Sequence, residues 1–195
     1  MNEVHLSPRE RILQSLARLL ETEPEKRITT AGLAREVGVT EAALYRHFPS
    51  KRKMFEGLVA FAEETVFGRL QSILEQQPDV HERLGQTATL LLIFCERNPG
   101  ITRVLTGAAL NGEDQQLQTR ASHFFDRFET ELRQILKNGE LDQGVRPLPD
   151  ASRAAALLMI QIEGRVQRFV RSGFRYLPTR GWEDVWLEMK GLLIK

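Results

Sequence analysis

The chain has 195 residues, of which 42% are hydrophobic and 27% are charged, and its formal net charge is +1. These proportions are ordinary for a water-soluble globular protein. No apolar run approaches the roughly 20 residues that a membrane-spanning helix needs, and the N-terminus lacks the basic-then-apolar pattern of an export signal. We therefore expect a cytoplasmic protein that is not inserted in a membrane.

The hydrophobic residues recur with helical spacing throughout, which predicts an all-α fold. Ser7, Pro8 and Glu10 predict the start of the first helix, because serine caps it, proline suits its first position and the glutamate can bond back to the cap. Further helices are expected at about residues 30–37, 41–47, 51–74, 80–97, 101–110, 113–137, 150–172 and 182–193, with a break at Asn111–Gly112 and a loop over residues 138–149.

The helix that begins near residue 51 is too long to belong only to a small N-terminal head. We therefore predict two domains, 1–53 and 54–195, with this helix linking them. The single cysteine, Cys95, lies in the longest apolar stretch and is expected to be a small buried side chain.

The segment from Ile28 to Lys51 has the pattern of a helix-turn-helix. A small residue, Ala34, allows two short helices to cross closely, and Gly38 suits a tight turn with a positive φ angle. Val39 and Leu44 are expected to hold the two helices together. Thr40 would cap the second one, whose N-terminal residues could enter a major groove of DNA.

Charge is concentrated in the same segment. Between Arg27 and Phe55 there are six basic and two acidic residues, so this stretch carries +4 and the rest of the chain −3. A local positive patch on a nearly neutral chain is typical of a confined nucleic-acid contact.

Several polar side chains of this segment suit phosphate or base contacts, because helix N-termini attract anions and residues after a cap can reach base edges. His47 could instead cap or pack, Glu41 could be a solvated first-turn acid, and the run of cations at 51–53 could be an ordinary solvated face. The predicted DNA-binding residues are Thr29, Thr30, Thr40, Glu41, Ala42, Tyr45, Arg46, His47, Ser50 and Lys51.

The segment resembles the N-terminal DNA-binding domain of the TetR family. The shared features are the threonine before the second helix, the turn, the Leu-Tyr-x-His-Phe motif and the Ser-Lys pair. The matching residues are Ala34, Gly38, Val39, Thr40, Leu44, Tyr45, His47, Phe48, Ser50 and Lys51. The resemblance implies a homodimer that binds double-stranded DNA, in which the helices at 113–137 and 150–172 of each subunit form a four-helix interface. Residues 1–6 lack the basic arm often found there, so we expect weaker non-specific affinity.

Nearly the whole chain is similar to a nucleoid-occlusion group within that family, as in Arg27-Ile-Thr-Thr30, Glu96-Arg-Asn-Pro-Gly100 and Arg168-Phe-Val-Arg-Ser172. This similarity implies a nucleoid-associated protein, with several dimers per DNA site in some cases, that binds the C-terminal tail of the division protein FtsZ and inhibits Z-ring assembly. The tail would lie in a groove between the fourth and fifth helices, at Phe61, Arg69, Leu90, Arg97 and Asn98.

Other readings of the groove residues remain open. Phe61 and Leu90 could be ordinary core, and Arg69 and Arg97 could form ion pairs. The bulky Ile93 is expected to narrow the groove.

The sequence favours this function over that of a ligand-responsive repressor and over that of an enzyme. A ligand-responsive TetR-type repressor would need a sizeable interior cavity with polar groups, whereas the helical interior is expected to be aliphatic and dense. No metal-ligand spacing, glycine-rich phosphate loop or nucleophile motif is present, and the four histidines are scattered. We therefore expect no enzyme activity, no cofactor and no metal.

Overall fold

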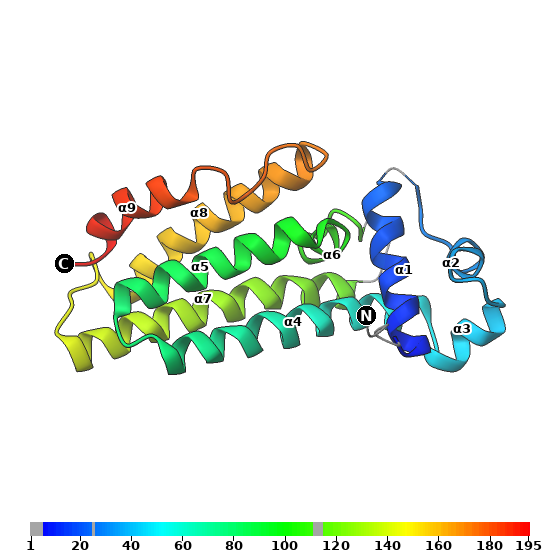
Figure 1. Ribbon diagram of the computed structural model, residues 1–195, viewed down its shortest axis with the longest axis horizontal. Helices are drawn as coiled ribbons and strands as arrows, with labels where there is room; N and C mark the ends of the chain where they lie inside the picture. The colour runs from blue at the N-terminus through cyan, green and yellow to red at the C-terminus, as the bar shows by residue number, and fades with distance from the viewer. Residues whose placement is uncertain (1–5, 25, 111–114) are drawn as a thin grey trace, which may run out of the picture. The chain divides into compact units, whose positions relative to one another are not determined.

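The computed structural model describes residues 6–24, 26–110 and 115–195, and these ranges contain nine α-helices and no strand (Figure 1). The all-α prediction is confirmed. The expected break at Asn111–Gly112 and the N-terminal arm before Leu6 lie outside the described residues. The helices are α1 (Pro8–Thr22), α2 (Thr30–Val37), α3 (Glu41–His47), α4 (Lys51–Gln76), α5 (Val80–Arg97), α6 (Pro99–Leu105), α7 (Gln115–Gln143), α8 (Ala151–Arg171) and α9 (Trp182–Leu193).

The chain forms two compact units, and α4 and α7 each contribute residues to both. Unit 1 consists of residues 1–62 and 98–122, and unit 2 consists of residues 63–97 and 123–195. These units, which are defined by packing, differ from the predicted domains 1–53 and 54–195. The two domains remain a prediction, in which DNA binding belongs to the first and dimerisation and partner binding to the second.

In unit 1, α6 packs closely against α1. A Cβ at Gly100 would lie 1.9 Å from the Ala17 carbonyl oxygen, so only glycine allows this approach. The guanidinium of Arg103 donates to the carbonyl oxygens of Leu20, at 2.6 Å, and Pro24, at 2.7 Å. Arg103 therefore satisfies carbonyl groups at the C-terminal end of α1.

The start of α1 is the predicted capping box. The Ser7 hydroxyl accepts a hydrogen bond from the Glu10 amide at 3.2 Å, and the Glu10 carboxylate accepts one from the Ser7 amide at 2.7 Å. Hydrogen bonding of the Glu10 carboxylate to the Ser7 side chain and to the Ser7 backbone amide lowers the pKa of Glu10.

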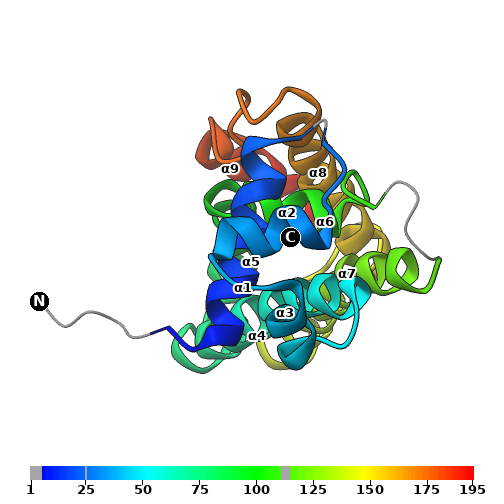
Figure 2. The same ribbon diagram turned by 90° about the vertical axis from the view of Figure 1, so that its right-hand side faces the viewer.

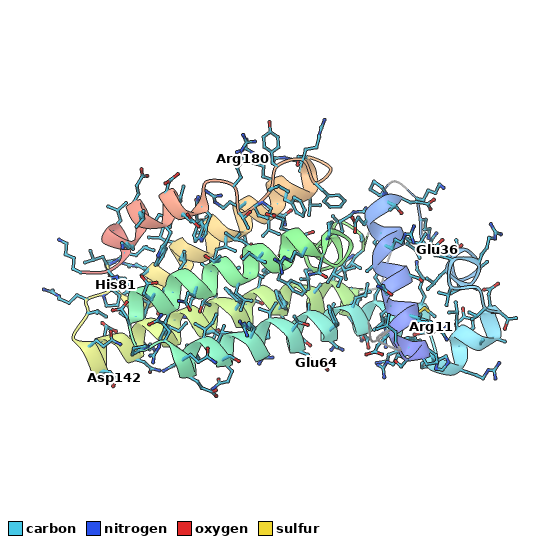
Figure 3. All side chains as sticks on the ribbon, viewed as in Figure 1. Arg11, Glu36, Glu64, His81, Asp142 and Arg180 are labelled. Atoms are coloured by element: carbon cyan, nitrogen blue, oxygen red, sulfur yellow. The ribbon has the colours of Figure 1, made fainter. Side chains whose placement is uncertain are left out.

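Aromatic side chains fill the interior of unit 2. Phe124, Phe128 and Phe169 are buried, and Gly85 gives room for the Trp186 ring, which a Cβ would meet at 2.5 Å. Charged side chains such as Glu64 and Asp142 point outward (Figure 3). Cys95 is buried as expected, and none of the helices in the described ranges is long and apolar enough to cross a membrane.

Two helix ends differ from the sequence expectation by five residues or more. The short helix α6 ends at Leu105 rather than near residue 110, because Gly107 turns the chain with a φ of +77°. The loop predicted over residues 138–149 is wrong at its start, because α7 continues to Gln143. Gly139 does not break the helix but gives room for Val80, whose Cγ2 would lie 2.6 Å from an added Cβ.

Candidate nucleic-acid interface

The turn between α2 and α3 is built as the sequence predicts. The Thr29 hydroxyl caps α2 by accepting a 3.1 Å hydrogen bond from the Gly32 amide, and Gly38 ends the helix with a φ of +77°. Ala34 is buried, and its carbonyl oxygen accepts from the Val39 amide at 2.9 Å. The side chain of Val39 was expected to hold the two helices together, which is wrong: it is 38% exposed.

The helix α3 turns Leu44 fully into unit 1, Ala43 is half-buried, and the other side chains are exposed. Thr40 caps α3 by accepting from the Ala43 amide at 3.2 Å, and Leu44 is completely buried. Tyr45 is 44% exposed. The other predicted DNA-binding residues on α3 are also exposed, namely Glu41, Ala42, Arg46 and His47. Figure 2 views unit 1 from the side of α2 and α3.

One hydrogen bond joins the first turns of the two short helices. The Thr30 hydroxyl donates to the Glu41 carboxylate at 2.7 Å. Glu41 is therefore not the simple solvated acid that the sequence left open, because it also holds α2 and α3 in register.

The start of α4 offers a further anion-attracting helix N-terminus. The Ser50 hydroxyl accepts from the Lys53 amide at 3.2 Å, which caps the helix. The Lys51 ammonium lies 5.4 Å from the centroid of the Phe55 ring, and the lysine side chain is half-buried. This cation–π contact positions the Lys51 charge beside the capped end of α4.

Sequence reasoning missed the role of Glu56 in this patch. Its carboxylate is 2.6 Å from the Lys53 ammonium, 3.2 Å from Arg52 and 3.7 Å from Arg120. The spacing of three and four residues from Lys53 and Arg52 was the signal that could have found it. Part of the predicted +4 charge is thus compensated within unit 1.

The predicted partner residues divide between the two units. In unit 1, Phe61 is 45% exposed, and it lines a largely apolar cavity of about 320 Å³ together with Asn98, Leu13, Leu58 and Ile101. In unit 2, Arg69 on α4 and Arg97 at the end of α5 are exposed, and Leu90 is half-buried. The structure thus brings Phe61 and Asn98 to one cavity, and Leu90 is not fully buried core.

Metal chemistry has no visible support in this part of the molecule. Within the ranges that the structure describes, no three His, Cys, Asp or Glu side chains are grouped so as to hold a metal ion. The polar groups that the two short helices expose include hydroxyls, a phenol, an imidazole and cations, which suit hydrogen bonds to phosphates and base edges, beside the carboxylates of Glu36 and Glu41.

Two short helices joined by a glycine turn, the second capped and exposed on one face, define the chain as a helix-turn-helix protein. Residues 12–58 match the family described as bacterial regulatory proteins, tetR family. Residues 78–193 match the tetracyclin repressor-like C-terminal domain. The chain belongs to the TetR family.

Curated relatives match over nearly the whole chain. The nucleoid occlusion factor SlmA of Marinobacter nauticus is 61% identical over 180 residues, which are 92% of each chain. Proteins with the same name from Shewanella pealeana and Vibrio cholerae are each 50% identical, over 181 and 182 residues and over 92% or more of both chains. The predicted resemblance to this group is confirmed.

Solved structures support the fold alone. The fatty acid degradation regulator FadR of Bacillus halodurans superposes with a TM-score of 0.78 at 15% identity, covering 97% of each chain. The MbdR regulator of Azoarcus also gives a TM-score of 0.78, at 16% identity over 97% of this chain and all of the other.

Proposed function

We propose that the protein is a nucleoid-occlusion factor that binds specific sites on chromosomal double-stranded DNA and, while bound, inhibits cell division over the nucleoid. The observation that carries DNA binding is the exposed face of α3, on which only Leu44 is fully buried. The name of relatives up to 61% identical supports the cellular role.

The exposed residues divide into two groups by their position. Glu41, Ala42 and Arg46 follow the Thr40 cap and would face base edges, since the N-terminal part of a recognition helix enters the major groove. The other contacts would go to phosphates and set the register on the duplex. They are Thr29, Thr30, Thr40, Tyr45, His47, Ser50 and Lys51.

A homodimer would supply one α3 to each of two half-sites. On α8, Leu157 and Ile160 are 51% and 68% exposed, and their spacing of three residues puts them on one helical face. Such exposed apolar side chains on one helical face favour a subunit interface that α7 and α8 form. Binding of several dimers to one DNA site would extend this arrangement.

The proposed partner is the C-terminal tail of FtsZ. An extended peptide needs an apolar slot for its side chains, and cations nearby suit acidic residues in it. Phe61 and Asn98 would supply the slot in unit 1. In unit 2, the proposed contacts with the tail are Arg69, Leu90 and Arg97, and the half-buried Ile93 of α5 would narrow the groove there.

The filled interior favours this function over that of a ligand-released repressor. Leu84, Leu91 and Phe169 are among the apolar side chains of unit 2 with 1% exposure or less. A sensor needs a cavity of several hundred Å³ between the helices, whereas the cavity of about 600 Å³ in unit 2 is open at the surface, beside α8 and the segment that follows it. Binding to DNA in the cytoplasm, at the nucleoid, follows from the proposed role.

The direct test is retention of FtsZ by the immobilised protein with and without genomic DNA fragments. We expect retention that DNA increases. Arg97→Glu should abolish retention while DNA affinity stays intact, and Arg146→Glu, the same change at another exposed arginine, should alter neither. No retention of FtsZ by the parent protein in the presence of DNA would overturn the partner, and loss of DNA binding in Arg97→Glu would indicate misfolding.

A further inference from the structure

A run of arginines follows the middle of α8. Between Gly164 and Trp182 the chain has five arginines and no acidic residue, although its net charge is only +1. Among the described residues, none of the five forms an ion pair. Glu96 of α5 reaches this loop, but its carboxylate accepts hydrogen bonds from the Thr179 amide and hydroxyl. None of the five arginines therefore has a carboxylate partner in direct contact within the described part of unit 2.

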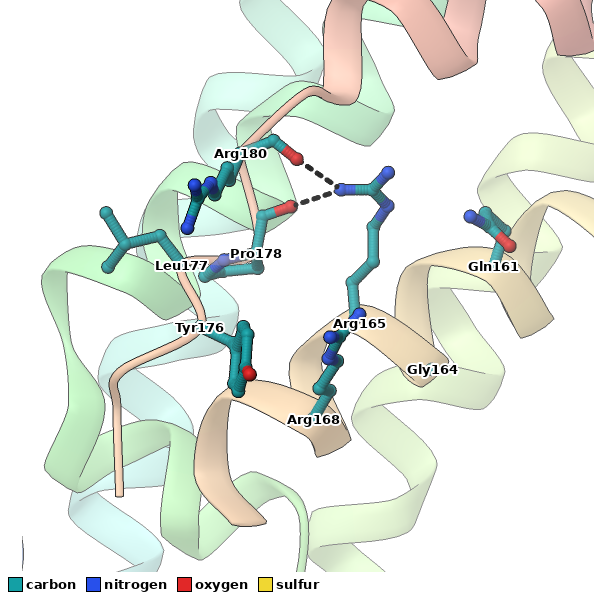
Figure 4. A pocket seen from close by; sticks show the side chains of 8 residues that line it. All are labelled: Gln161, Gly164, Arg165, Arg168, Tyr176, Leu177, Pro178 and Arg180. Carbon is teal, nitrogen blue, oxygen red and sulfur yellow. Dashed lines mark hydrogen bonds between the residues drawn. The ribbon is translucent and has the colours of Figure 1, made fainter. Parts of the chain in front are cut away.

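Three of these arginines line one open cavity of about 600 Å³ (Figure 4). Arg165 and Arg168 come from α8, and Arg180 comes from the segment between α8 and α9. Apolar and aromatic surface is provided by Tyr176, Leu177 and Pro178, and no carboxylate lines the cavity. Its volume lies within the range of small-molecule sites.

Arg165 is fixed at the wall of this cavity. One of its terminal nitrogens, Nη1, donates to the carbonyl oxygens of Pro178, at 3.0 Å, and Arg180, at 3.1 Å. The guanidinium also lies 5.3 Å from the centroid of the Trp182 ring. Figure 4 shows it pointing from α8 toward the loop. Because these contacts order the side chain before any ligand arrives, little entropy is lost on binding.

The Arg165 guanidinium is also incompletely satisfied. Its Nε is buried and has no hydrogen-bond partner among the described residues. Burial and the positive charge of Arg168 lower the pKa of Arg165. A half-buried cation beside a like charge, with one buried donor unused, favours the approach of an anion.

Arg168 is held in a similar way. Its guanidinium lies 4.2 Å from the centroid of the Tyr176 ring, and the side chain lines the cavity. A planar guanidinium that stacks on an aromatic ring can still make paired hydrogen bonds to an oxyanion. Two ordered guanidiniums and a third on the facing loop suit a ligand with more than one charged group.

From these observations we propose that the cavity binds a small organic anion with at least two phosphate groups, of about the size of a nucleoside diphosphate. The three arginines would bind the phosphates, and Leu177 and Pro178 would contact the organic part. This site is separate from the helix-turn-helix, but it requires that Arg168 stays accessible beside the face of α8 that is proposed for the dimer interface.

Two other anions are outcomes of the test. Gly164 and Arg168 continue the helical face of Leu157 and Ile160, so a carboxylate of a second subunit could approach Arg168. A DNA phosphate could also be drawn to the arginines. Either would make the cavity part of an interface, and the small anion would then not bind there.

The experiment is calorimetric titration of the full chain with adenosine diphosphate, pyrophosphate and succinate, with the fluorescence of the neighbouring Trp182 as a second readout. The variants are Arg168→Gln and Arg180→Gln. Arg171→Gln is the matched control, because Arg171 is an exposed arginine of α8 outside the cavity lining. Sedimentation velocity of each variant follows the oligomeric state.

We expect both phosphates to bind, succinate to bind more weakly, and each cavity variant to lose about tenfold in affinity while the control changes little. Four results would overturn the site: no binding of either phosphate, equal binding of succinate, equal loss in Arg171→Gln, or competition between the nucleotide and duplex DNA. Dissociation of a dimer in Arg168→Gln, with no phosphate binding in the parent, would assign the arginine to a subunit contact instead.

Discussion

The hydroxyl of Thr30 donates a 2.7 Å hydrogen bond to the carboxylate of Glu41, so the first turns of α2 and α3 are joined directly. Both residues were also predicted to contact DNA. The bond gives Glu41 a structural role on a surface that must accept phosphates, where its negative charge is unfavourable.

Thr30→Val should therefore lower the free energy of unfolding by about 1 kcal/mol, since the hydrogen bond is lost and the shape is kept. Glu41→Gln is the matched variant, because it keeps an oxygen acceptor and removes the charge. We expect it to lose less stability than Thr30→Val and to bind non-specific duplex DNA more tightly. Urea unfolding and fluorescence anisotropy measure the two effects, and weaker binding by Glu41→Gln would contradict this account.

Lys51 and Lys53 provide a comparison of two nearby cations. Lys53 is paired with Glu56 at 2.6 Å, whereas Lys51 lies over Phe55 at the capped start of α4. Lys51→Ala should reduce the slope of log affinity against log salt concentration by about 0.9, the value for one phosphate contact. Lys53→Ala should change the slope less. Equal slopes for Lys51→Ala and the parent protein would remove Lys51 from the phosphate contacts.

Gly38 and Gly68 should respond in opposite directions to alanine. A Cβ at either position meets nothing within 4 Å, so only the backbone conformation matters. Gly38 has a φ of +77°, and Gly38→Ala should cost about 1–2 kcal/mol of stability. Gly68 lies inside α4, where alanine should stabilise by about 0.5–1 kcal/mol. Thermal unfolding measures both, and a stable Gly38→Ala variant would contradict the left-handed turn.

The sequence predicts the local features of this fold better than those that depend on long-range packing. The caps at Ser7 and Thr40 and the turn at Gly38 depend on neighbours three or four residues away, and for this reason local pattern predicts them well. The predicted packing role of Val39 was wrong because the exposure of its side chain depends on how α2 and α3 cross. The predicted start of the loop at residue 138 was wrong because Gly139 packs against Val80, which lies 59 positions earlier in the chain.

In the candidate sites, too, the features set by local sequence were predictable and those set by long-range packing were not. The exposed face of α3 was predictable from one buried position, Leu44, and the helical period. The compensation of Arg52 and Lys53 by Glu56 needed side-chain geometry, and so did the unsatisfied Nε of Arg165. A long-range ion pair such as Arg120–Glu56 leaves no signal in a single sequence.

Glu163 on α8 gives a prediction about pH. Burial, with the negative charges of Glu129 and Asp126, raises the pKa of the Glu163 carboxyl. The folded state then holds the proton more tightly than the unfolded chain. The stability that results is fully present below the ordinary glutamate pKa and is lost as pH rises through the raised value.

Glu163→Gln cannot ionise and should therefore be more stable than the parent protein at neutral pH, with a smaller loss of stability between acidic and neutral conditions. Urea unfolding midpoints at about pH 4 and about pH 7 measure the difference. The exposed Glu140 of α7 gives the control variant, Glu140→Gln. A Glu163→Gln variant that is less stable at neutral pH would show that the charged carboxylate is favourable.

We propose above all that α3 recognises specific base sequences in double-stranded DNA. Selection from a random duplex library, followed by anisotropy measurements on the selected and a scrambled duplex, tests it most directly. We predict paired half-sites whose centres are about 34–36 Å apart along the duplex and an affinity roughly 10³-fold or more above that for the scrambled duplex. Arg46→Ala should lose most of this preference. Equal affinity for the selected and scrambled duplexes would contradict the account.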